Sequence, residues 1–119
     1  MTNLISSAPH IHDATSYDDL VDWGAQPDMV AGASVSSGRL LYKGPNSQPE
    51  AGLWVCTPGV WRLHIPRDEA CHFIAGRAIY RSDKGEEIMV SAGTFVLFPA
   101  GWAGVCDVQE TIRNLYMLA

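Results

Sequence analysis

The sequence predicts an all-β fold, and three observations support this prediction. From about residue 29 onward, short apolar or alternating runs recur, separated by glycine, proline, asparagine or aspartate. This half of the chain carries no strong helical pattern, and no internal repeat is present. Many short strands at close spacing favour a sandwich or a barrel, because only these architectures bury every strand and manage the sheet edges.

Residues 1–28 are expected to form a mostly irregular N-terminal arm, part of the same domain as a barrel of residues 29–119. Polar and turn-forming residues dominate this arm, and its one regular signal is a weak helical pattern at residues 16–23. Ser16 could cap a short helical turn there, and Gly24 and Pro27 would end it.

The barrel region contains a series of candidate strands joined by turns. Residues 44–49 form a loop by composition, and residues 82–85 read as a hairpin turn in which Gly85 can adopt a positive φ. The predicted strands are Met29–Ala33, Arg39–Lys43, Gly52–Cys56, Val60–Ile65, Glu69–Ala75, Arg77–Arg81, Glu87–Val90, Phe95–Phe98, Gly104–Val108 and Thr111–Leu118.

Length and composition narrow the class of protein. A chain of 119 residues with 47% hydrophobic and 18% charged residues is expected to form one globular domain. The net charge is −5, and the 8 lysines and arginines are scattered, so neither nucleic acid nor an anionic membrane surface is an expected partner. The apolar runs are too short to span a membrane, and the N-terminus does not resemble a secretory signal.

The 3 cysteines, Cys56, Cys71 and Cys106, are widely spaced and odd in number. They cannot all pair, and none forms a C-x-x-C clip, so we expect neither a disulfide framework nor a structural zinc site. Each lies in an apolar stretch, which favours buried thiols in a reducing cytoplasm.

Two spaced motifs carry a family resemblance. Gly76 follows Glu69 with six residues between them, and Pro99-Ala100-Gly101 follows Gly93 with five between. These resemble the two halves of the cupin signature. More closely, the stretches at residues 52–59, 68–71, 99–102 and 111–116 are similar to small single-domain cupins of the ureidoglycine-aminohydrolase type. The resemblance covers about residues 30–118 and implies a double-stranded β-helix barrel, jelly-roll-like and often dimeric, with a small-molecule pocket inside.

The resemblance also indicates which metal ligands are missing. Metal-binding cupins have histidines six and four residues before the glutamate and another five after the second-motif proline. Leu63, Ile65 and Gly104 occupy these positions, so Glu69 alone remains. The ureidoglycine enzymes instead use a glutamine four residues after the proline, where this chain has Ala103. We therefore expect no metal cofactor, with a divalent transition metal as the alternative.

His64 is the fallback ligand for such a metal, together with Glu69. Strand alternation places Trp61, Leu63 and Ile65 on one face and His64 on the other. Burying the apolar face is favoured, since each large apolar side chain contributes about 1.5–3 kcal/mol on burial. Only a bulge at Ile65-Pro66 would turn His64 inward.

Glu69 is the candidate catalytic residue, as a general acid or base. If its carboxyl points into an apolar barrel without a cation, desolvation raises its pKa toward neutrality. The structural alternative is that Glu69 pairs with Arg62, Arg77 or Arg113, or hydrogen-bonds a tyrosine or tryptophan. The expected pocket around it consists of Trp61, Leu63, Ile65, Cys71, Phe73 and Gly104.

Three functions remain open from the sequence. The first is a metal-free cupin that binds a small metabolite inside the barrel. The second is an enzyme of the hydrolase or lyase range, acting on a small nitrogen- or carboxylate-containing metabolite through Glu69, with or without a metal. The third is a structural or regulatory dimer whose interior is filled by its own side chains. A homodimer is expected in each case, because exposed strand edges need covering.

Overall fold

A computed structural model describes residues 7–119. Its regular elements within these residues are β-strands, from Val21 onward, and one short 3-10 turn, η1. The prediction of an all-β fold is confirmed. The elements in chain order are β1 (Val21–Ala25), β2 (Met29–Gly32), β3 (Val35–Lys43), η1 (Pro45–Ser47), β4 (Glu50–Cys56), β5 (Gly59–His64), β6 (Glu69–Ser82), β7 (Glu87–Val90), β8 (Phe95–Phe98) and β9 (Ala103–Leu118).

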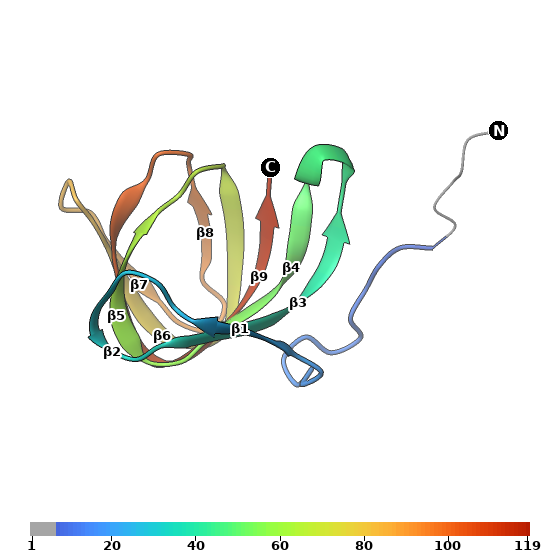
Figure 1. Cartoon of the computed structure of the whole chain (residues 1–119), viewed down its shortest axis with the longest axis horizontal. Helices are drawn as coiled ribbons and strands as arrows, with labels where there is room; N and C mark the ends of the chain where they lie inside the picture. Colours follow the sequence, from blue (N-terminus) through green and yellow to red (C-terminus); the bar gives the residue numbers. More distant parts are fainter. Residues whose placement is uncertain (1–6) are drawn as a thin grey trace.

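Two long strands, β6 and β9, organise the sheet. They pair with one another antiparallel along most of their length. The first half of β9 also pairs with β5, and its second half with β4, while β8 and β7 pair with successive parts of β6. Strands β1 and β3 extend the sheet beyond β4, and β2 extends it beyond β5. The sheet therefore curls around an enclosed interior (Figure 1).

Each of these long strands was predicted as two shorter ones. The break expected at Gly76 is a bend inside β6, where the pairing register with β9 shifts several times. Gly76 adopts φ +85°, and a Cβ there would clash with the Thr111 carbonyl. A glycine at this position therefore lets the strand turn the corner of the barrel without ending.

The helical turn predicted at residues 16–23 is wrong. Residues 14–16 form a turn, and Val21–Ala25 pair with β3 as an edge strand. Trp23 lies against Gly38, where a Cβ would come within 2.5 Å of its indole ring. Arg113 on β9 anchors the preceding segment by donating to the carbonyls of Ala14 and Tyr17, at 3.0 and 2.8 Å. Tertiary pairing has thus overridden a weak local helical preference.

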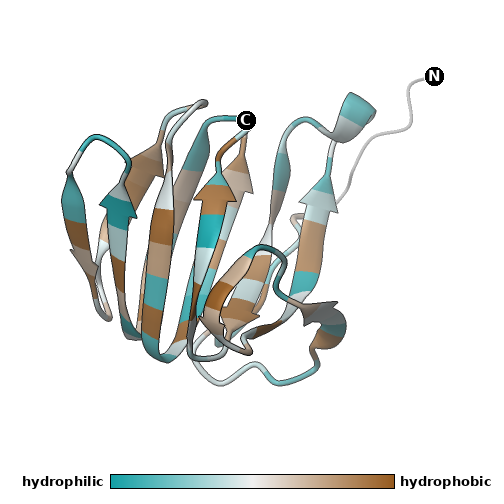
Figure 2. Cartoon of the chain, turned by 60° about the vertical axis from the view of Figure 1, so that its left-hand side comes forward, coloured by the Kyte–Doolittle hydropathy of each residue, from teal (hydrophilic) through white to brown (hydrophobic). Residues whose placement is uncertain are grey.

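The hydrophobic pattern alternates along the strands, visible as successive brown and teal bands (Figure 2). Inward positions build one core cluster, which includes Phe73, Tyr80, Phe98 and Ile112. Among residues 7–119, no helix has the length and apolar character needed to cross a membrane.

Candidate functional site

A cavity of about 300 Å³ lies inside the barrel. Strands β4, β5, β6, β8 and β9 supply most of its wall, and the segment around β1 closes one side. The lining residues are Trp23, Gln26, Glu50, Trp54, Trp61, Leu63, Ile65, Glu69, Cys71, Tyr80, Phe98, Asn114, Tyr116 and Leu118.

The pairing register explains one wall of the cavity. Residues that are directly opposite on neighbouring strands point to the same face of a sheet. The inward residues of β4, β9 and β6 therefore form successive rows across three strands. From the outer end inward, these rows are Glu50–Leu118–Glu69, Gly52–Tyr116–Cys71 and Trp54–Asn114–Phe73.

Glu69 occupies the outermost row, at the end where β4 and β6 begin and β9 ends (Figure 1). Among the described residues, its one side-chain hydrogen-bond partner is the Cys71 thiol, whose sulfur lies 3.5 Å from a Glu69 carboxyl oxygen. Burial is the largest influence on the pKa of Glu69 and raises it; the hydrogen bond from the Cys71 thiol lowers it in part, and the negative charge of Glu50 adds a smaller increase. Glu69 is thus a carboxyl group that holds its proton more strongly than usual.

Glu50 is the second carboxyl of the cavity. The Tyr116 hydroxyl donates to it at 3.1 Å. Tyr116 has room to lean toward Glu50 because its neighbour across the strand is Gly52, where a Cβ would lie 3.0 Å from the hydroxyl oxygen and 2.6 Å from the Arg39 carbonyl oxygen. Burial, followed by the nearby Glu50, raises the pKa of Tyr116, so the phenol remains a neutral donor.

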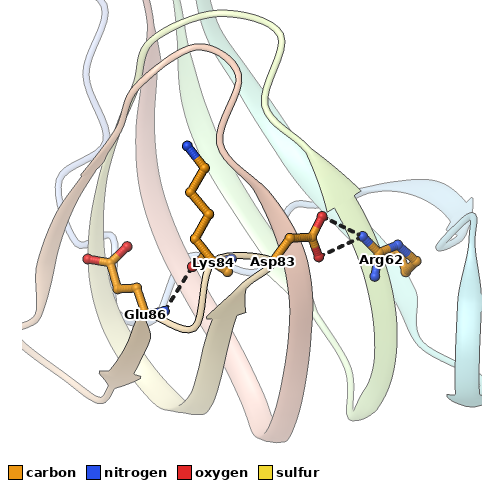
Figure 3. Close-up of polar contacts among 5 residues, drawn as sticks. Arg62, Asp83, Lys84 and Glu86 are labelled. Carbon is orange, nitrogen blue, oxygen red and sulfur yellow. Dashed lines mark hydrogen bonds and ion pairs between the residues drawn. The ribbon is translucent and has the colours of Figure 1, made fainter.

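No arginine pairs with Glu69 among residues 7–119, although three were candidates. Arg62 donates to both carboxylate oxygens of Asp83 at 2.9 and 3.0 Å, on the turn between β6 and β7 (Figure 3). Arg77 pairs with Glu110 on the outer surface, and Arg113 binds the backbone of the N-terminal arm. Lys43 is directly opposite Glu50 on β3, and Arg67 donates to the carbonyls of Ser47, Leu118 and Ala119 at the same end of the barrel. Neither of them, nor any other lysine or arginine among residues 7–119, forms an ion pair with Glu50 or Glu69.

Two further polar atoms of cavity-lining residues have no hydrogen-bond partner among the described residues: the Asn114 side-chain oxygen and the Trp61 indole N–H. Asn114 is 1% exposed, and its side-chain oxygen accepts no hydrogen bond. An unsatisfied buried acceptor costs about 1–3 kcal/mol, so such atoms are rare unless a ligand or water completes them. Asn114 stands between Trp54 and Phe73 in the third row and lines the cavity.

Aromatic rings form much of the remaining surface. Trp54 and Trp61 meet edge to face, with ring centroids 6.0 Å apart and planes at 87°. The Trp54 indole is fixed because its N–H donates to Ser36, which in turn donates to Gln26. Tyr80 and Phe98 pack opposite, with centroids 5.1 Å apart.

Most of the predicted site residues lie together. Glu69, Trp61, Leu63, Ile65 and Cys71 all line the cavity. Burial, followed by the charge of Glu69, raises the pKa of the Cys71 thiol, which keeps it protonated and a poor nucleophile.

Two predicted pocket residues, Phe73 and Gly104, do not line the cavity. Phe73 is 0% exposed, packs against Tyr80 and belongs to the core cluster, and it does not line the cavity. Gly104 is buried where β9 and β6 approach closely, and a Cβ there would lie 2.8 Å from the Ser82 Cα. It serves strand packing and does not line the cavity.

The donor set does not fit a metal ion. His64 is exposed, so the fallback pair of His64 and Glu69 does not converge inside the barrel. Leu63 and Ile65 line the cavity at two of the remaining cupin ligand positions. Within residues 7–119, no group of three histidine, cysteine, aspartate or glutamate side chains could hold a metal.

Nine of the lining residues were not predicted, among them the polar residues Glu50, Asn114 and Tyr116. The alternation Ile112, Asn114, Tyr116, Leu118 contained a usable signal, since its apolar members require the polar ones to face inward as well. Glu50 had no such signal, because it directly follows a proline-containing loop.

Comparisons with known proteins agree with this architecture. The sequence matches the EutQ-like cupin domain family over residues 43–116. No curated protein matches it. The chain is similar in structure to a putative ethanolamine utilization protein Q from Salmonella typhimurium, with a TM-score of 0.62, 20% identity and coverage of 71% of this chain and 68% of that one.

Two proteins of the DUF861 family are also similar, and the one from Pseudomonas syringae is described as having unknown function. For the Pseudomonas syringae protein the TM-score is 0.78 at 18% identity, and the match covers 90% of this chain but 46% of that one. For the Thermotoga maritima protein the TM-score is 0.55 at 22% identity, and the match covers 56% of this chain and 76% of that one. At these identities the likeness shows the fold, which is the cupin barrel. The chain belongs to the family of EutQ-like cupin domains.

Proposed function

We propose that this small cupin binds a small organic molecule inside its barrel and does so without a metal ion. The observation that carries the proposal is the cavity of about 300 Å³, with aromatic walls and a carboxyl, Glu69, that has no cationic partner among the described residues. Ligand pockets have roughly this size or more, and combine apolar walls with a few convergent polar groups. Its volume favours a ligand over an interior filled by side chains.

A pair of matched variants tests this function. Leu63→Trp fills the cavity, whereas Met89→Trp adds the same side chain at a position that is 67% exposed. In a ligand-observed NMR screen of small aromatic and aliphatic compounds, hits should bind the wild type and Met89→Trp but not Leu63→Trp. Hits that bind both variants equally would place binding outside the barrel. Elemental analysis of protein purified without a metal column should find less than one transition metal per chain.

A second candidate function is catalysis, favoured by the raised pKa of Glu69. The finer resemblance to the ureidoglycine-aminohydrolase type points to a hydrolase or lyase acting on a small nitrogen- or carboxylate-containing metabolite, with Glu69 as general acid or base. Glu69→Gln should then abolish turnover of a screened substrate while the substrate still binds. Unchanged turnover would remove this candidate.

We also propose a homodimer. The outward face of β8, β6 and β9 carries Leu97, Ala70 and Met117 in one row, and Phe95 lies beside them on β8. Phe95, Leu97 and Met117 are 50–66% exposed, an apolar patch of the kind that a partner subunit covers. Light scattering should give twice the chain mass, and Leu97→Lys should reduce it to the monomer mass. A monomeric wild type would contradict the dimer.

The cytoplasm remains the proposed compartment. Cys56, Cys71 and Cys106 are all buried and free, as expected in a reducing environment.

A further inference from the structure

We propose that the ligand of the cavity is an organic cation: a primary or secondary ammonium group on a small apolar or aromatic body. This inference rests on the proposed function and names the chemical class of its ligand. Three groups of side chains carry it, namely two carboxyls, one buried amide oxygen and a set of aromatic rings.

The two carboxyls lie on either side of one position. Glu50 and Glu69 are both directly opposite Leu118, on the strands that flank β9. Two strand spacings place their Cα atoms about 10 Å apart, a separation that two flexible side chains can bridge around one small group. No lysine or arginine among residues 7–119 forms an ion pair with either carboxyl. Arg39, Arg62, Arg77 and Arg81 pair with other acids, Arg67 is bound to backbone carbonyls, and the exposed Lys43 is opposite Glu50 on β3 without pairing with it. The missing positive charge is therefore left for a ligand to supply.

Asn114 provides independent support. Its side-chain oxygen is an acceptor that is buried, lines the cavity and has no donor among the described residues. A ligand that completes it must bring a hydrogen-bond donor. An ammonium N–H group satisfies this oxygen and the carboxyls together, because it carries positive charge and donates without accepting.

The aromatic walls fit the same ligand. The perpendicular rings of Trp54 and Trp61 present two adjoining surfaces, and Tyr80, Phe98 and Tyr116 line the rest of the wall. Aromatic faces attract cations, and a cage of several rings with nearby acids is a recurring way to bind organic ammonium groups. An anionic ligand would instead meet two carboxyls, whose repulsion disfavours it.

Ligand charge should be coupled to the proton on Glu69. The titratable groups that face Glu69 are Glu50 on β4, Cys71 and Tyr80 on β6, and Tyr116 on β9. None of them is a cation, and the nearby Arg67 is bound to the backbone carbonyls of Ser47, Leu118 and Ala119. Burial raises the pKa of Glu69, the Cys71 thiol lowers it in part, and Glu50 adds a smaller increase. A bound ammonium group favours the ionised carboxylate, so binding should release a proton, and affinity should rise with pH until Glu69 is fully ionised.

Isothermal titration calorimetry with benzylammonium and its neutral counterpart, benzyl alcohol, tests the inference. We expect benzylammonium to bind the wild type roughly tenfold or more tightly than benzyl alcohol, because a charge-assisted hydrogen bond is stronger than a neutral one. Titrations in two buffers of different ionisation enthalpy should detect proton release for benzylammonium only.

Variants assign the effect to the named side chains. Glu69→Gln and Glu50→Gln should each weaken benzylammonium binding roughly tenfold and change benzyl alcohol binding little. Glu110→Gln is the matched control, since Glu110 pairs with Arg77 on the outer surface, and it should change neither. If Glu69→Gln does not fold, Glu50→Gln and the pH dependence of the wild type still decide the question.

The outcomes separate the two proposals. Equal affinity for benzylammonium and benzyl alcohol overturns the cation inference and leaves a cavity that binds neutral molecules. A preference for benzylammonium that survives both glutamine variants also overturns it. If neither compound binds and the wider screen finds no hit that Leu63→Trp abolishes, the proposed function itself fails.

Discussion

The two ends of the barrel interior are built from the same strands but from different kinds of residue. At the packed end, the inward positions of β4, β6 and β9 are apolar and almost completely inaccessible to solvent. At the cavity end, toward the start of β4 and β6 and the end of β9, the inward positions include Glu50, Glu69, Asn114 and Tyr116. The packed end consists of Cys56, Phe73, Ala78, Val108 and Ile112, each between 0 and 2% exposed.

This difference separates residues that stabilise the barrel from residues available for function. The packed end follows the rule that inward strand positions are apolar. The cavity end breaks this rule, and the polar groups there are only partly satisfied by protein partners. A local departure from the folding pattern without a structural compensation indicates a functional site.

The largest expected effect is on stability, at the packed end. Phe73→Ala removes a ring that is 0% exposed and leaves a cavity, so the free energy of unfolding should fall by about 3–5 kcal/mol. Met89→Ala is the matched control, because Met89 is 67% exposed and lies outside the patch proposed for the dimer. Urea unfolding of both variants measures the contrast, and similar losses for the two would mean that the packed end is not the stabilising region.

The second effect concerns the pH dependence of stability at the cavity end. The folded-state pKa of Glu69 lies above the ordinary value of 4.5 because of burial. The folded state therefore binds more protons than the unfolded state between these two values, and the contribution of Glu69 to stability falls as pH rises through that window. Glu69→Gln has no such loss.

The free energy of unfolding of Glu69→Gln should therefore increase relative to that of the wild type as pH rises above about 4.5, and the difference should then level off. Glu110→Gln, on the outer surface, serves as the control. Chemical denaturation at a series of pH values provides the measurement. A difference between Glu69→Gln and wild type that stays constant with pH would mean that Glu69 is not held in a desolvating environment.

A smaller effect is expected from Tyr116→Phe, which removes one hydroxyl at the cavity end. The variant loses a hydrogen bond of 3.1 Å to Glu50 and keeps the ring, so stability should fall by about 1 kcal/mol. Thermal unfolding can detect a change of this size. No change in stability would show that this hydrogen bond adds nothing beyond solvation of the two groups.

The smallest effect is expected at the outer surface. Asp83→Asn breaks the ion pair with Arg62. The Asp83 side chain is 53% exposed and the Arg62 side chain 51%. An exposed ion pair of this kind contributes about 0–1 kcal/mol, and less at high salt. A loss above this range would assign the β6–β7 turn a larger role than its exposure allows.

Much of the barrel could be predicted from the sequence, because alternation and turn residues are local signals. The strands Glu87–Val90 and Phe95–Phe98 were predicted with their observed bounds. The bend at Gly76 was predicted as a strand end, since a glycine in the sequence is compatible both with a turn between strands and with a bend inside one strand. The edge strand Val21–Ala25 was missed because its formation depends on β3, which lies further along the chain.

The site was less accessible to sequence reasoning for a similar reason. Strand phase was enough to bring Trp61, Leu63, Ile65, Glu69 and Cys71 to one surface. The pairing of Arg62 with Asp83, and the resulting isolation of Glu69 from any described cation, depends on contacts between distant residues. The same holds for Glu50, which reaches the cavity only because β4 begins opposite the end of β9.

The most direct test of this account is the titration of the Glu69 carboxyl itself, followed by carbon-13 NMR of the side-chain carboxyl carbon. The wild type should titrate with a midpoint clearly above 4.5, and the midpoint should fall when benzylammonium is added. A midpoint at or below 4.5 in the free protein would contradict the account, because it would show that the protein already supplies Glu69 with a compensating charge or with full solvation.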